Sequence, residues 1–598
     1  MRTIHQRLGY VAIILTIIGG VLIARLLSFQ YRLDPEIEEQ LYTIASASGG
    51  IEVEYQPNRG QIFDRDGQIL AVNTLLYRVG ISPGAIGPSR EEKREYAIEI
   101  ARILEMSELE VLNRLLPNEL GQYPSYVLLK SPVSLEQGAA LEALDIPGMV
   151  IEPIYQREYP QGKLMSQLLG FVNFESQGYW GVEQYYQSTL AGQSFITTET
   201  GLLLDDISRN LLIRDGQDLT LTIDRDAQWE VLQALAKTVE EQEAVGGTVI
   251  VMNPETGEIL AMVSYPTFTI DEYNAIPQDE KPQFNPAIEM IYEPGSIFKV
   301  LTAAAALDSG VADLNWTYTN FGCETIAGGD ICDADSLPGA SYARGIVPFA
   351  NCLINSLNTC TAHWLIGGPS YSGVGSDRWY GYLRAFGFGV PTGVDMWGEA
   401  AGIVNWPNTP AYGEFNFVQT SFGQGISVTP LQMLTAVNAI ANDGLIMQPH
   451  IVYSFKDGNT VRLVEPAPIS RPISAATAQQ VLAIMERAVE DEGPEVWGRL
   501  ARVEGYRVAG KTGTSQKIIG GQYSDDLSWA SFIGFIPADN PQLSILIMID
   551  EPRDYWGSQV AAPLFSEIAS RLVVLFEIPP DNLRRQLITD GGNPFGRD

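Results

Sequence analysis

Three short strings of reactive side chains stand in order along the sequence: Ser296-Ile-Phe-Lys299, Ser356-Leu-Asn358 and Lys511-Thr-Gly513. A serine hydroxyl is a weak nucleophile unless a neighbouring base takes its proton. The chain contains only three histidines, and none accompanies Ser296, so a Ser-His-Asp triad is not expected. Lys299 is therefore the candidate base, and the strings indicate nucleophilic catalysis by a serine.

The surroundings of these strings matter, because an isolated Ser-x-x-Lys more often marks a helix start with a solvated lysine. Ser296 follows Glu-Pro-Gly and opens a predicted helix that continues through 300–307. Its hydroxyl then lies at the positive end of the helix dipole, with Lys299 one turn away on the same face. Burial and the like charge of Lys511 would lower the pKa of Lys299, as a base requires.

The hydrophobic pattern around the strings predicts the elements that position them. Predicted strands flank the turn at 254–257, surround Lys511, and cover 529–536 and 543–549, while a helix spans 429–441. Helices cluster between these strands, so we expect a sheet whose outer strands come from distant parts of the chain. Gly513 has no side chain and lets another segment approach the Lys511 strand closely.

The predicted fold class is multi-domain α+β. The segments are a tail at 1–7, a membrane anchor at 8–28, an elongated mixed α/β pedestal at 29–215, the domain with the three strings at 216–575, and a polar C-terminal tail at 576–598. In the pedestal, Asp66-Gly67 between two apolar strands predicts a β-hairpin.

The anchor is predicted from 17 uncharged residues, Leu8 to Ala24, which Leu26 and Leu27 extend. About 20 such residues cross a bilayer as a helix. A cleaved signal peptide is the alternative, but no small-x-small site follows the apolar run. Basic residues lie on both sides of the segment, so charge alone decides its orientation only weakly.

Composition excludes several classes of protein. The 598 residues are 45% hydrophobic and 18% charged, which is typical of folded domains rather than of a disordered chain. The net charge of −34 opposes binding to phosphate backbones, so we expect no nucleic-acid partner. With so few histidines we also expect no metal and no cofactor.

The four cysteines form two neighbouring pairs in the sequence. Cys323 and Cys332 lie nine positions apart across a Gly-Gly, which suits a small disulfide loop; two free buried thiols are the alternative, and a zinc site is a remote one. Cys352 and Cys360 bracket the second string. A continuous helix would hold them about 12 Å apart, so a bond between them requires a break in the helix.

In this order and spacing, the three strings resemble the active site of penicillin-binding proteins and serine β-lactamases. The resemblance to class B penicillin-binding proteins runs from the anchor to about residue 570. It also includes the following strings: Arg59-Gly60, Asp64-Arg65, Gly178-x-x-Gly181-x-Glu183, Tyr292-Glu-Pro-Gly, Gly423-Gln-Gly425, Thr429-Pro-Leu-Gln432 and Phe532-x-Gly534. The resemblance implies a single-pass bacterial membrane protein with a cytoplasmic N-terminus. Its pedestal or dimerisation domain and its β-lactamase-like transpeptidase domain, an antiparallel sheet flanked by helices, would lie outside the cytoplasm.

The resemblance also implies a role for each residue. Ser296 would attack the penultimate D-Ala carbonyl with Lys299 as base, Ser356 would relay the proton, and Asn358 would orient Lys299 and a substrate amide. Lys511, with Thr512, Gly513 and Thr514, would hold the terminal carboxylate of the donor peptide. The backbone N–H groups of Ser296 and Thr514 would form the oxyanion hole. An amine of a neighbouring stem peptide would then resolve the acyl-enzyme and cross-link peptidoglycan.

Several choices stay open within this interpretation. The Ser-x-Asn form of the second string favours septal wall synthesis, with lateral-wall elongation as the alternative. A β-lactam-sensing receptor and a D,D-carboxypeptidase are remote alternatives. The expected partners are peptidoglycan stem peptides, β-lactam antibiotics, the membrane, and a multi-pass glycosyltransferase of the shape, elongation, division and sporulation family. Gly19-Gly20 in the anchor offers a close-packing face for that partner.

Overall fold

The computed structural model describes the chain from Ile51 to Thr589, except for 56, 119, 174, 194, 200–213, 279–280, 335–344, 370 and 494–495. The tail and anchor predicted at 1–28 lie outside these residues. Among the described residues, no helix has both the length and the apolarity needed to cross a bilayer. Internal contacts divide the chain into two units, of which the smaller includes 191–216 and the larger consists of 60–190 and 217 onward.

Short strands open both units. In the smaller unit β1 (Ile51–Tyr55) pairs antiparallel with β8 (Phe195–Glu199). In the larger unit β2 (Ile62–Phe63) pairs antiparallel with β3 (Ile69–Ile81), which confirms the hairpin predicted around Asp66-Gly67. Gly67 has a φ of 82°, a left-handed conformation that glycine adopts without strain.

The pedestal core forms around β3. This strand also pairs with β4 (Val127–Val133) and β5 (Met149–Glu158). Its apolar residues share a buried cluster with three helices, α3 (Arg90–Leu104), α4 (Glu108–Leu115) and α5 (Leu135–Glu142). Glu183 of the Gly178-x-x-Gly181-x-Glu183 string lies in α7 (Gly181–Tyr185), and its carboxylate pairs with Arg157 of β5 at 2.8 Å. Both side chains are at least 97% buried, so the ion pair is part of the pedestal interior.

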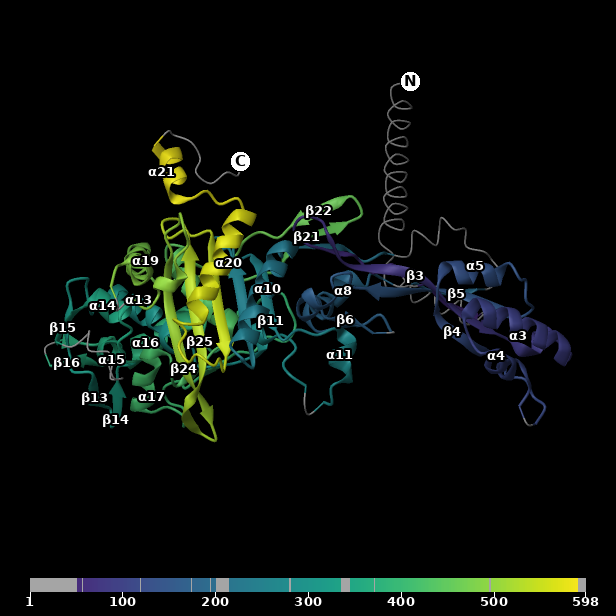
Figure 1. Cartoon of the computed structure of the whole chain (residues 1–598), viewed down its shortest axis with the longest axis horizontal. Coiled ribbons are helices and arrows are strands. Elements are labelled where there is room, and N and C mark those ends of the chain that lie inside the picture. The colour runs from purple at the N-terminus through teal and green to yellow at the C-terminus, as the bar shows by residue number, and fades with distance from the viewer. Residues whose placement is uncertain are drawn as a thin grey trace, which may run out of the picture. The chain divides into compact units, whose positions relative to one another are not determined.

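The main sheet is antiparallel, and its strands lie between residues 246 and 550 (Figure 1). Its strand order is β11 (Ile259–Tyr265), β10 (Gly246–Met252), β26 (Leu543–Asp550), β25 (Gln522–Ile536) and β24 (Ala509–Ile519). Strand β10 therefore pairs with β26, which begins almost three hundred residues later in the chain. This arrangement confirms the prediction that distant parts of the chain build one sheet.

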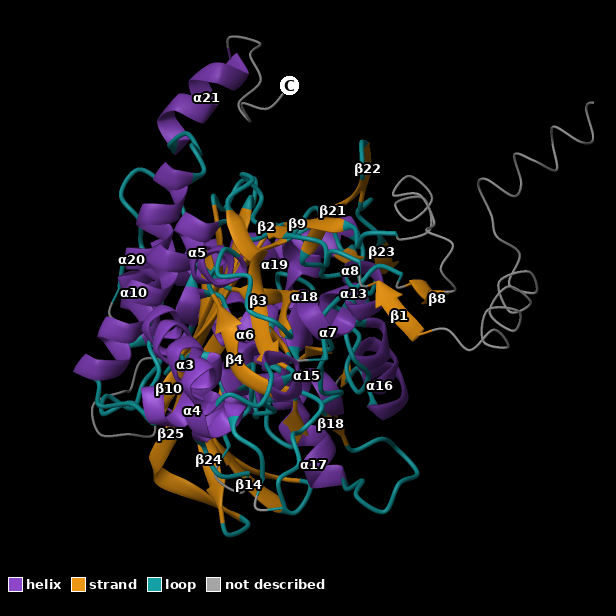
Figure 2. Cartoon of the chain, turned by 90° about the vertical axis from the view of Figure 1, so that its right-hand side faces the viewer, coloured by secondary structure: helices purple, strands orange, loops and turns teal. Residues whose placement is uncertain are grey.

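Helices cover both faces of this sheet. Because alternate residues of a strand point to opposite faces, Val249 and Val251 of β10 belong to one apolar cluster, whereas Ile250 and Met252 belong to another. The first cluster includes α10 (Arg225–Glu241) and α20 (Ala561–Leu575), which lie together on one side in Figure 2. The second includes α13 (Lys299–Asp308) and α18 (Pro430–Ala441).

Helix α18 begins where its sequence predicts. The Thr429 hydroxyl accepts a hydrogen bond from the Gln432 N–H at 3.1 Å, and the Gln432 side chain accepts one from the Thr429 N–H at 2.9 Å. This capping box satisfies two of the N–H groups that a helix start leaves unpaired. With Pro430 at the first helical position, it confirms the predicted helix at 429–441.

The second string lies in an excursion from the main sheet. Here β12 (Thr317–Asn320) pairs with β15 (Gly345–Pro348), and β13 (Cys323–Ile326) pairs with β14 (Gly329–Cys332). Two short helices follow, α14 (Phe349–Ile354) and α15 (Asn358–Ile366). Other helices between the strands of the main sheet in sequence are α12 (Pro286–Glu289), α16 (Ser376–Ala385), α17 (Glu414–Gln419) and α19 (Ala475–Glu490).

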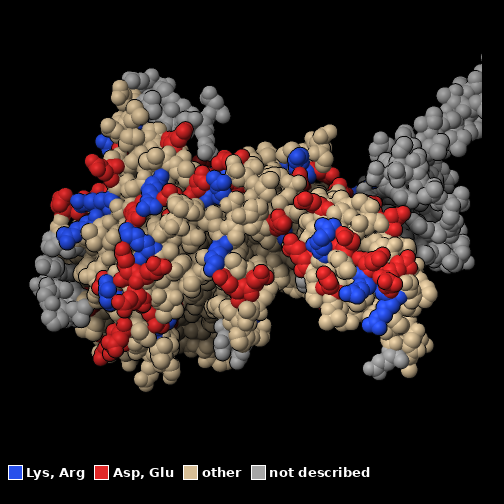
Figure 3. All heavy atoms as spheres, turned by 45° about the vertical axis from the view of Figure 1, so that its right-hand side comes forward, with Lys and Arg blue, Asp and Glu red and all other residues tan. Residues whose placement is uncertain are grey.

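The segment predicted as a polar tail, 576–598, starts with ordered structure. It contains α21 (Asp581–Thr589), and Arg584 of this helix is only 1% exposed. The guanidinium of Arg584 pairs with Asp539 and with Asp581. The surface elsewhere mixes acidic and basic side chains over the face in Figure 3.

Candidate active site

Ser296 lies in a 3-10 turn, Gly295–Phe298, that leads directly into α13. Gly295 has a φ of 59°, and its N–H donates to the Gly423 carbonyl oxygen at 3.0 Å. A Cβ at position 295 would stand 2.7 Å from the Thr514 carbonyl oxygen of β24. Glycine is therefore required for the serine turn to approach β24 this closely.

Lys299 is fully buried at the start of α13. Its Nζ donates to the carbonyl oxygen of Ser356 and, at 3.2 Å, to the Ser356 Oγ. Lys511 on β24 is also buried, and its Nζ donates to the Ser356 Oγ and to the Thr512 carbonyl oxygen, each at 2.9 Å. The Ser356 hydroxyl thus accepts from both lysines, which leaves its own proton free for a third group.

The electrostatics of this lysine pair favour proton exchange near neutral pH. Burial, followed by the like charge of Lys511, holds the pKa of Lys299 well below its usual range, while the Asp333 carboxylate opposes that shift. Burial lowers the pKa of Lys511 to about 7. Lys299 can therefore lose its proton and act as a base under conditions in which a solvated lysine stays charged.

A break between two helices places Ser356. Helix α14 ends at Ile354 and α15 begins at Asn358, and Ser356 between them has a φ of 56°. The chain turns back so far that the Leu357 N–H donates to the Cys352 carbonyl oxygen at 3.0 Å. Cys352 and Cys360, whose Cα atoms lie 5.9 Å apart, form a buried disulfide across the break. This is the break that the sequence requires for such a bond.

The side-chain amide of Asn358 contacts the hairpin that precedes the second string. Its Nδ2 donates to the Cys332 carbonyl oxygen at 2.8 Å, at the end of β14. Lys299 is instead held by Ser356, through both its carbonyl and its hydroxyl oxygen. The amide of Asn358 therefore fixes the second string against the β13–β14 hairpin.

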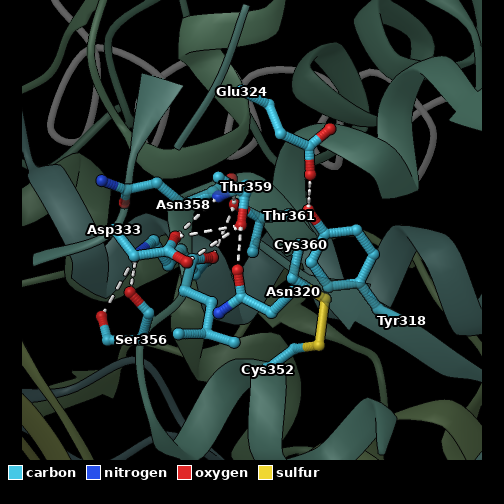
Figure 4. The surroundings of a disulfide bond; sticks show 12 residues. Tyr318, Asn320, Glu324, Asp333, Cys352, Ser356, Asn358, Thr359, Cys360 and Thr361 are labelled. Atoms are coloured by element: carbon cyan, nitrogen blue, oxygen red, sulfur yellow. Dashed lines mark hydrogen bonds between the residues drawn. A yellow bond between two sulfur atoms is a disulfide. The ribbon is translucent and has the colours of Figure 1, made fainter. Parts of the chain in front are cut away.

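A polar network that sequence reasoning missed supports the same string. Asp333, which follows β14, accepts hydrogen bonds from the Thr359 N–H at 2.9 Å and from the Thr359 Oγ1 at 3.1 and 3.0 Å. The Asp333 carboxylate thereby caps the first turn of α15. Figure 4 shows this network next to the Cys352–Cys360 disulfide, with Asn320 on the side toward the disulfide, where its Oδ1 lies 3.4 Å from the Thr359 Oγ1. Asp333 stands in a loop, and its spacing from the strings gave no signal.

The third string borders the serine turn along β24. A Cβ at Gly513 would lie 2.3 Å from the Ser531 Oγ and 2.8 Å from the Ile297 Cγ2. Gly513 therefore permits the close approach that its sequence suggested. The Thr514 Oγ1 accepts from the Gly557 N–H at 3.1 Å, and Thr512 is 9% exposed beside Lys511.

The other cysteines and the histidines make their own contacts, away from Lys299 and Lys511. Cys323 and Cys332 face each other across β13–β14 and are bonded, and both residues are exposed. His363 contacts Glu324 and the Gly367 carbonyl oxygen, each at 2.9 Å. His450 is buried, with its Nδ1 3.2 Å from the Gln448 carbonyl oxygen. These contacts give both histidines structural roles.

Two family models match this chain. The model of the penicillin-binding protein transpeptidase domain matches residues 247–570, and that of the penicillin-binding protein dimerisation domain matches residues 54–200. The first contains all three strings, and the second contains the pedestal hairpin and Glu183. The two matches together span most of the described chain.

Similar proteins agree with these models. The chain is 31% identical over 578 residues to stage V sporulation protein D of Bacillus subtilis, covering 95% of this chain and 85% of the relative. It is 29% identical to a probable peptidoglycan D,D-transpeptidase, PenA of Neisseria meningitidis, covering 87% and 85%. Among solved structures, penicillin-binding protein 3 of Mycobacterium tuberculosis in complex with aztreonam is 27% identical, with a TM-score of 0.65 and coverage of 88% and 98%.

Proposed function

Because this chain belongs to the class B penicillin-binding proteins, we propose that it is a serine-type D-alanyl-D-alanine transpeptidase. In this proposal the enzyme cross-links peptidoglycan through an acyl-enzyme at Ser296. The name of the Neisseria relative supports the activity, and the aztreonam complex of the Mycobacterium protein supports binding of β-lactams.

One observation carries the proposal: the Ser356 Oγ lies within 3.2 Å of the Lys299 Nζ and 2.9 Å of the Lys511 Nζ. A base and a proton relay are thereby joined in a buried site one helical turn from Ser296. The same geometry links the relay to Lys511, the group proposed to hold the substrate carboxylate. No histidine is needed for either proton transfer.

The proposed reaction proceeds in two acyl transfers. Lys299 takes the Ser296 proton as the Oγ attacks the penultimate D-Ala carbonyl carbon, and the backbone N–H groups of Ser296 and Thr514 stabilise the resulting oxyanion. One such donor is typically worth about 3 kcal/mol. Ser356 passes a proton to the leaving nitrogen as the C–N bond breaks and D-Ala departs. The amine of a neighbouring stem peptide then attacks the ester, forms the new amide and regenerates Ser296.

Benzylpenicillin tests the nucleophile, because its strained amide mimics the donor amide and leaves a stable ester. The intact mass of the wild-type protein should rise by one drug molecule, and Ser296→Ala should not react. Ser309→Ala is the matched control, since Ser309 closes the same helix but its hydroxyl bonds only to the Ala306 carbonyl oxygen among the described residues; it should react at the wild-type rate. Equal labelling of Ser296→Ala would refute the assignment.

The cellular setting is a second part of the proposal. The Ser-x-Asn form of the second string supports septal synthesis, with lateral-wall elongation as the alternative, and the name of the Bacillus relative adds sporulation as a further setting. A membrane anchor at 8–28 would hold the catalytic domain outside the cytoplasm and dock on a multi-pass glycosyltransferase. A fluorescent fusion that marks the sidewall and not midcell would overturn the septal assignment. Exchange of 8–28 for an unrelated membrane helix tests the docking by co-purification.

A further inference from the structure

A cavity of about 300 Å³ lies beside the turn that carries Ser296. Its polar lining comes from five places in the chain: Glu293 before the turn, Asn405 after β18 (Ile403–Val404), Asn416 and Gln419 of α17, Ser427 of β19 (Ile426–Ser427), and Tyr523 near the tip of the β24–β25 hairpin. This volume is at the lower end for ligand sites. It suits one side chain of a substrate rather than a whole peptide.

The Glu293 carboxylate is the unusual group in this lining. It is 9% exposed, and its Oε1 accepts from the Gly425 N–H at 2.7 Å and from the Tyr523 hydroxyl at 3.3 Å. The buried Oε2 has no hydrogen-bond partner among the described residues. A buried acceptor without a donor destabilises the folded protein. The Glu293 carboxylate therefore has acceptor capacity that the described residues leave unused.

The rest of the lining selects the charge of such a ligand. No lysine or arginine lines the cavity within the described residues, and the neighbouring Asn405 Nδ2 is engaged with the Asn416 Oδ1 at 3.1 Å. Ile403 and Ile518 add apolar walls. Burial raises the pKa of the Glu293 carboxyl, and a bound cation would favour its ionised form. An ammonium on an aliphatic chain matches this combination of an acceptor, neutral amides and apolar walls.

The cavity wall is continuous with the nucleophile turn. Glu293 stands three residues before Ser296. Gly425, whose N–H donates to Glu293, comes two residues after Gly423. Gly423 in turn accepts from the Gly295 N–H at 3.0 Å. A group bound in the cavity would therefore lie next to the turn that carries Ser296.

We propose that this cavity binds a primary ammonium group of the peptide substrate through Glu293. The proposal deepens the function proposed above and rests on it. That reaction supplies the ligand, because an amine of a neighbouring stem peptide resolves the acyl-enzyme. The same amino acid side chain is present on the donor peptide when donor and acceptor are alike. The donor and the acceptor are thus two sources of one ligand chemistry.

The test compares substrates that differ only in this charge. The donors are peptide thioesters in which a thiolate replaces the D-Ala that leaves. They carry either a lysine or a norleucine side chain at the third residue, and the rate of acyl-enzyme formation is measured for each. In a second arm, lysine amide and norleucine amide compete as acceptors for a preformed acyl-enzyme. We expect a preference for the cationic member of about tenfold in one arm, which also identifies the source, and its loss in Glu293→Gln.

Two further variants separate binding from folding. Glu399→Gln neutralises another carboxylate, partly buried, which accepts from Thr392 and Gly393 and does not line the cavity; it should keep the wild-type preference. Tyr523→Phe removes one donor to Glu293 and should keep or increase the preference. Equal rates for both members of each pair in the wild type, or an unchanged ratio in Glu293→Gln, would overturn the ammonium site. Failure of benzylpenicillin to acylate wild-type Ser296 would instead overturn the proposed function.

Discussion

The Cys352–Cys360 disulfide has a predicted catalytic effect that can be separated from its effect on stability. The bond closes a loop of eight residues, and Cys323–Cys332 closes one of nine. In the chain-entropy picture, loops of this length stabilise the folded state by about 2.5 kcal/mol each at 25 °C. The double variants Cys352→Ala/Cys360→Ala and Cys323→Ala/Cys332→Ala should therefore lose similar free energies of unfolding.

Their effects on acylation should differ, because only the first bond spans the helix break. In a continuous helix the Cα atoms of residues 352 and 360 would lie about 12 Å apart, whereas the break holds them at 5.9 Å. Without the bond, Ser356 loses part of the restraint on its left-handed φ of 56°. We expect acylation by benzylpenicillin to slow at least tenfold, equivalent to about 1.4 kcal/mol of barrier. In the control, ladder hydrogen bonds between β13 and β14 keep the hairpin, so the rate should change less than threefold.

Urea unfolding gives the two free energies, and mass spectrometry of the acylated protein at timed intervals gives the two rates. Equal acylation rates in two folded variants of similar stability would refute the claim that the disulfide positions Ser356. A loss well below 2 kcal/mol in both variants would refute the chain-entropy estimate and leave the positioning claim intact.

Three further predictions follow from the same site. The second-order rate constant for acylation should depend on pH in a bell-shaped way. It should rise as Lys299 loses its proton and fall above about pH 7 as Lys511 loses the charge that holds the substrate carboxylate. A flat pH profile would contradict the assigned roles. Asp333→Asn removes the charge that raises the pKa of Lys299 and should shift the rising limb to lower pH, whereas Asp330→Asn on the exposed hairpin should leave it in place, as pH–rate profiles will show. Gly513→Ala should slow acylation more than tenfold, because the new Cβ meets Ile297 and Ser531. The control is Gly381→Ala in α16, whose new Cβ meets no atom within 4 Å; it should leave the acylation rate and the melting temperature unchanged or slightly raised.

Much of the main sheet could be predicted, because its strands carry continuous or alternating apolar residues and are bounded by turns. The Asp66-Gly67 hairpin, the strands on either side of 254–257 and the helix at 429–441 depend on local signals, namely turn residues and a capping box. Such signals act over a few residues, so sequence reasoning reaches them directly.

The contacts of the second string could not be predicted in the same way. Which side chain holds Lys299 depends on the helix break at Ser356, and the helix that follows the break is capped by a residue far away in sequence. The Asp333 carboxylate reaches Thr359 across 26 positions, and the Arg584 guanidinium reaches Asp539 across 45. These are tertiary interactions of single residues, which leave no periodic pattern in the sequence.

The order of strands in the main sheet sets the time at which activity can first appear. Strand β10 pairs with β11, its neighbour in sequence, and with β26, which ends at Asp550. In the proposed topology the segments after the anchor cross the membrane in sequence order, so the β10 edge stays exposed until nearly the whole protein has crossed. Cys352 and Cys360 are only eight residues apart, so the loop containing Ser356 can be closed long before Lys511 arrives. The last step in assembling the enzyme would then be the docking of β24 onto a relay that is already in place, and unfinished chains would bind no penicillin.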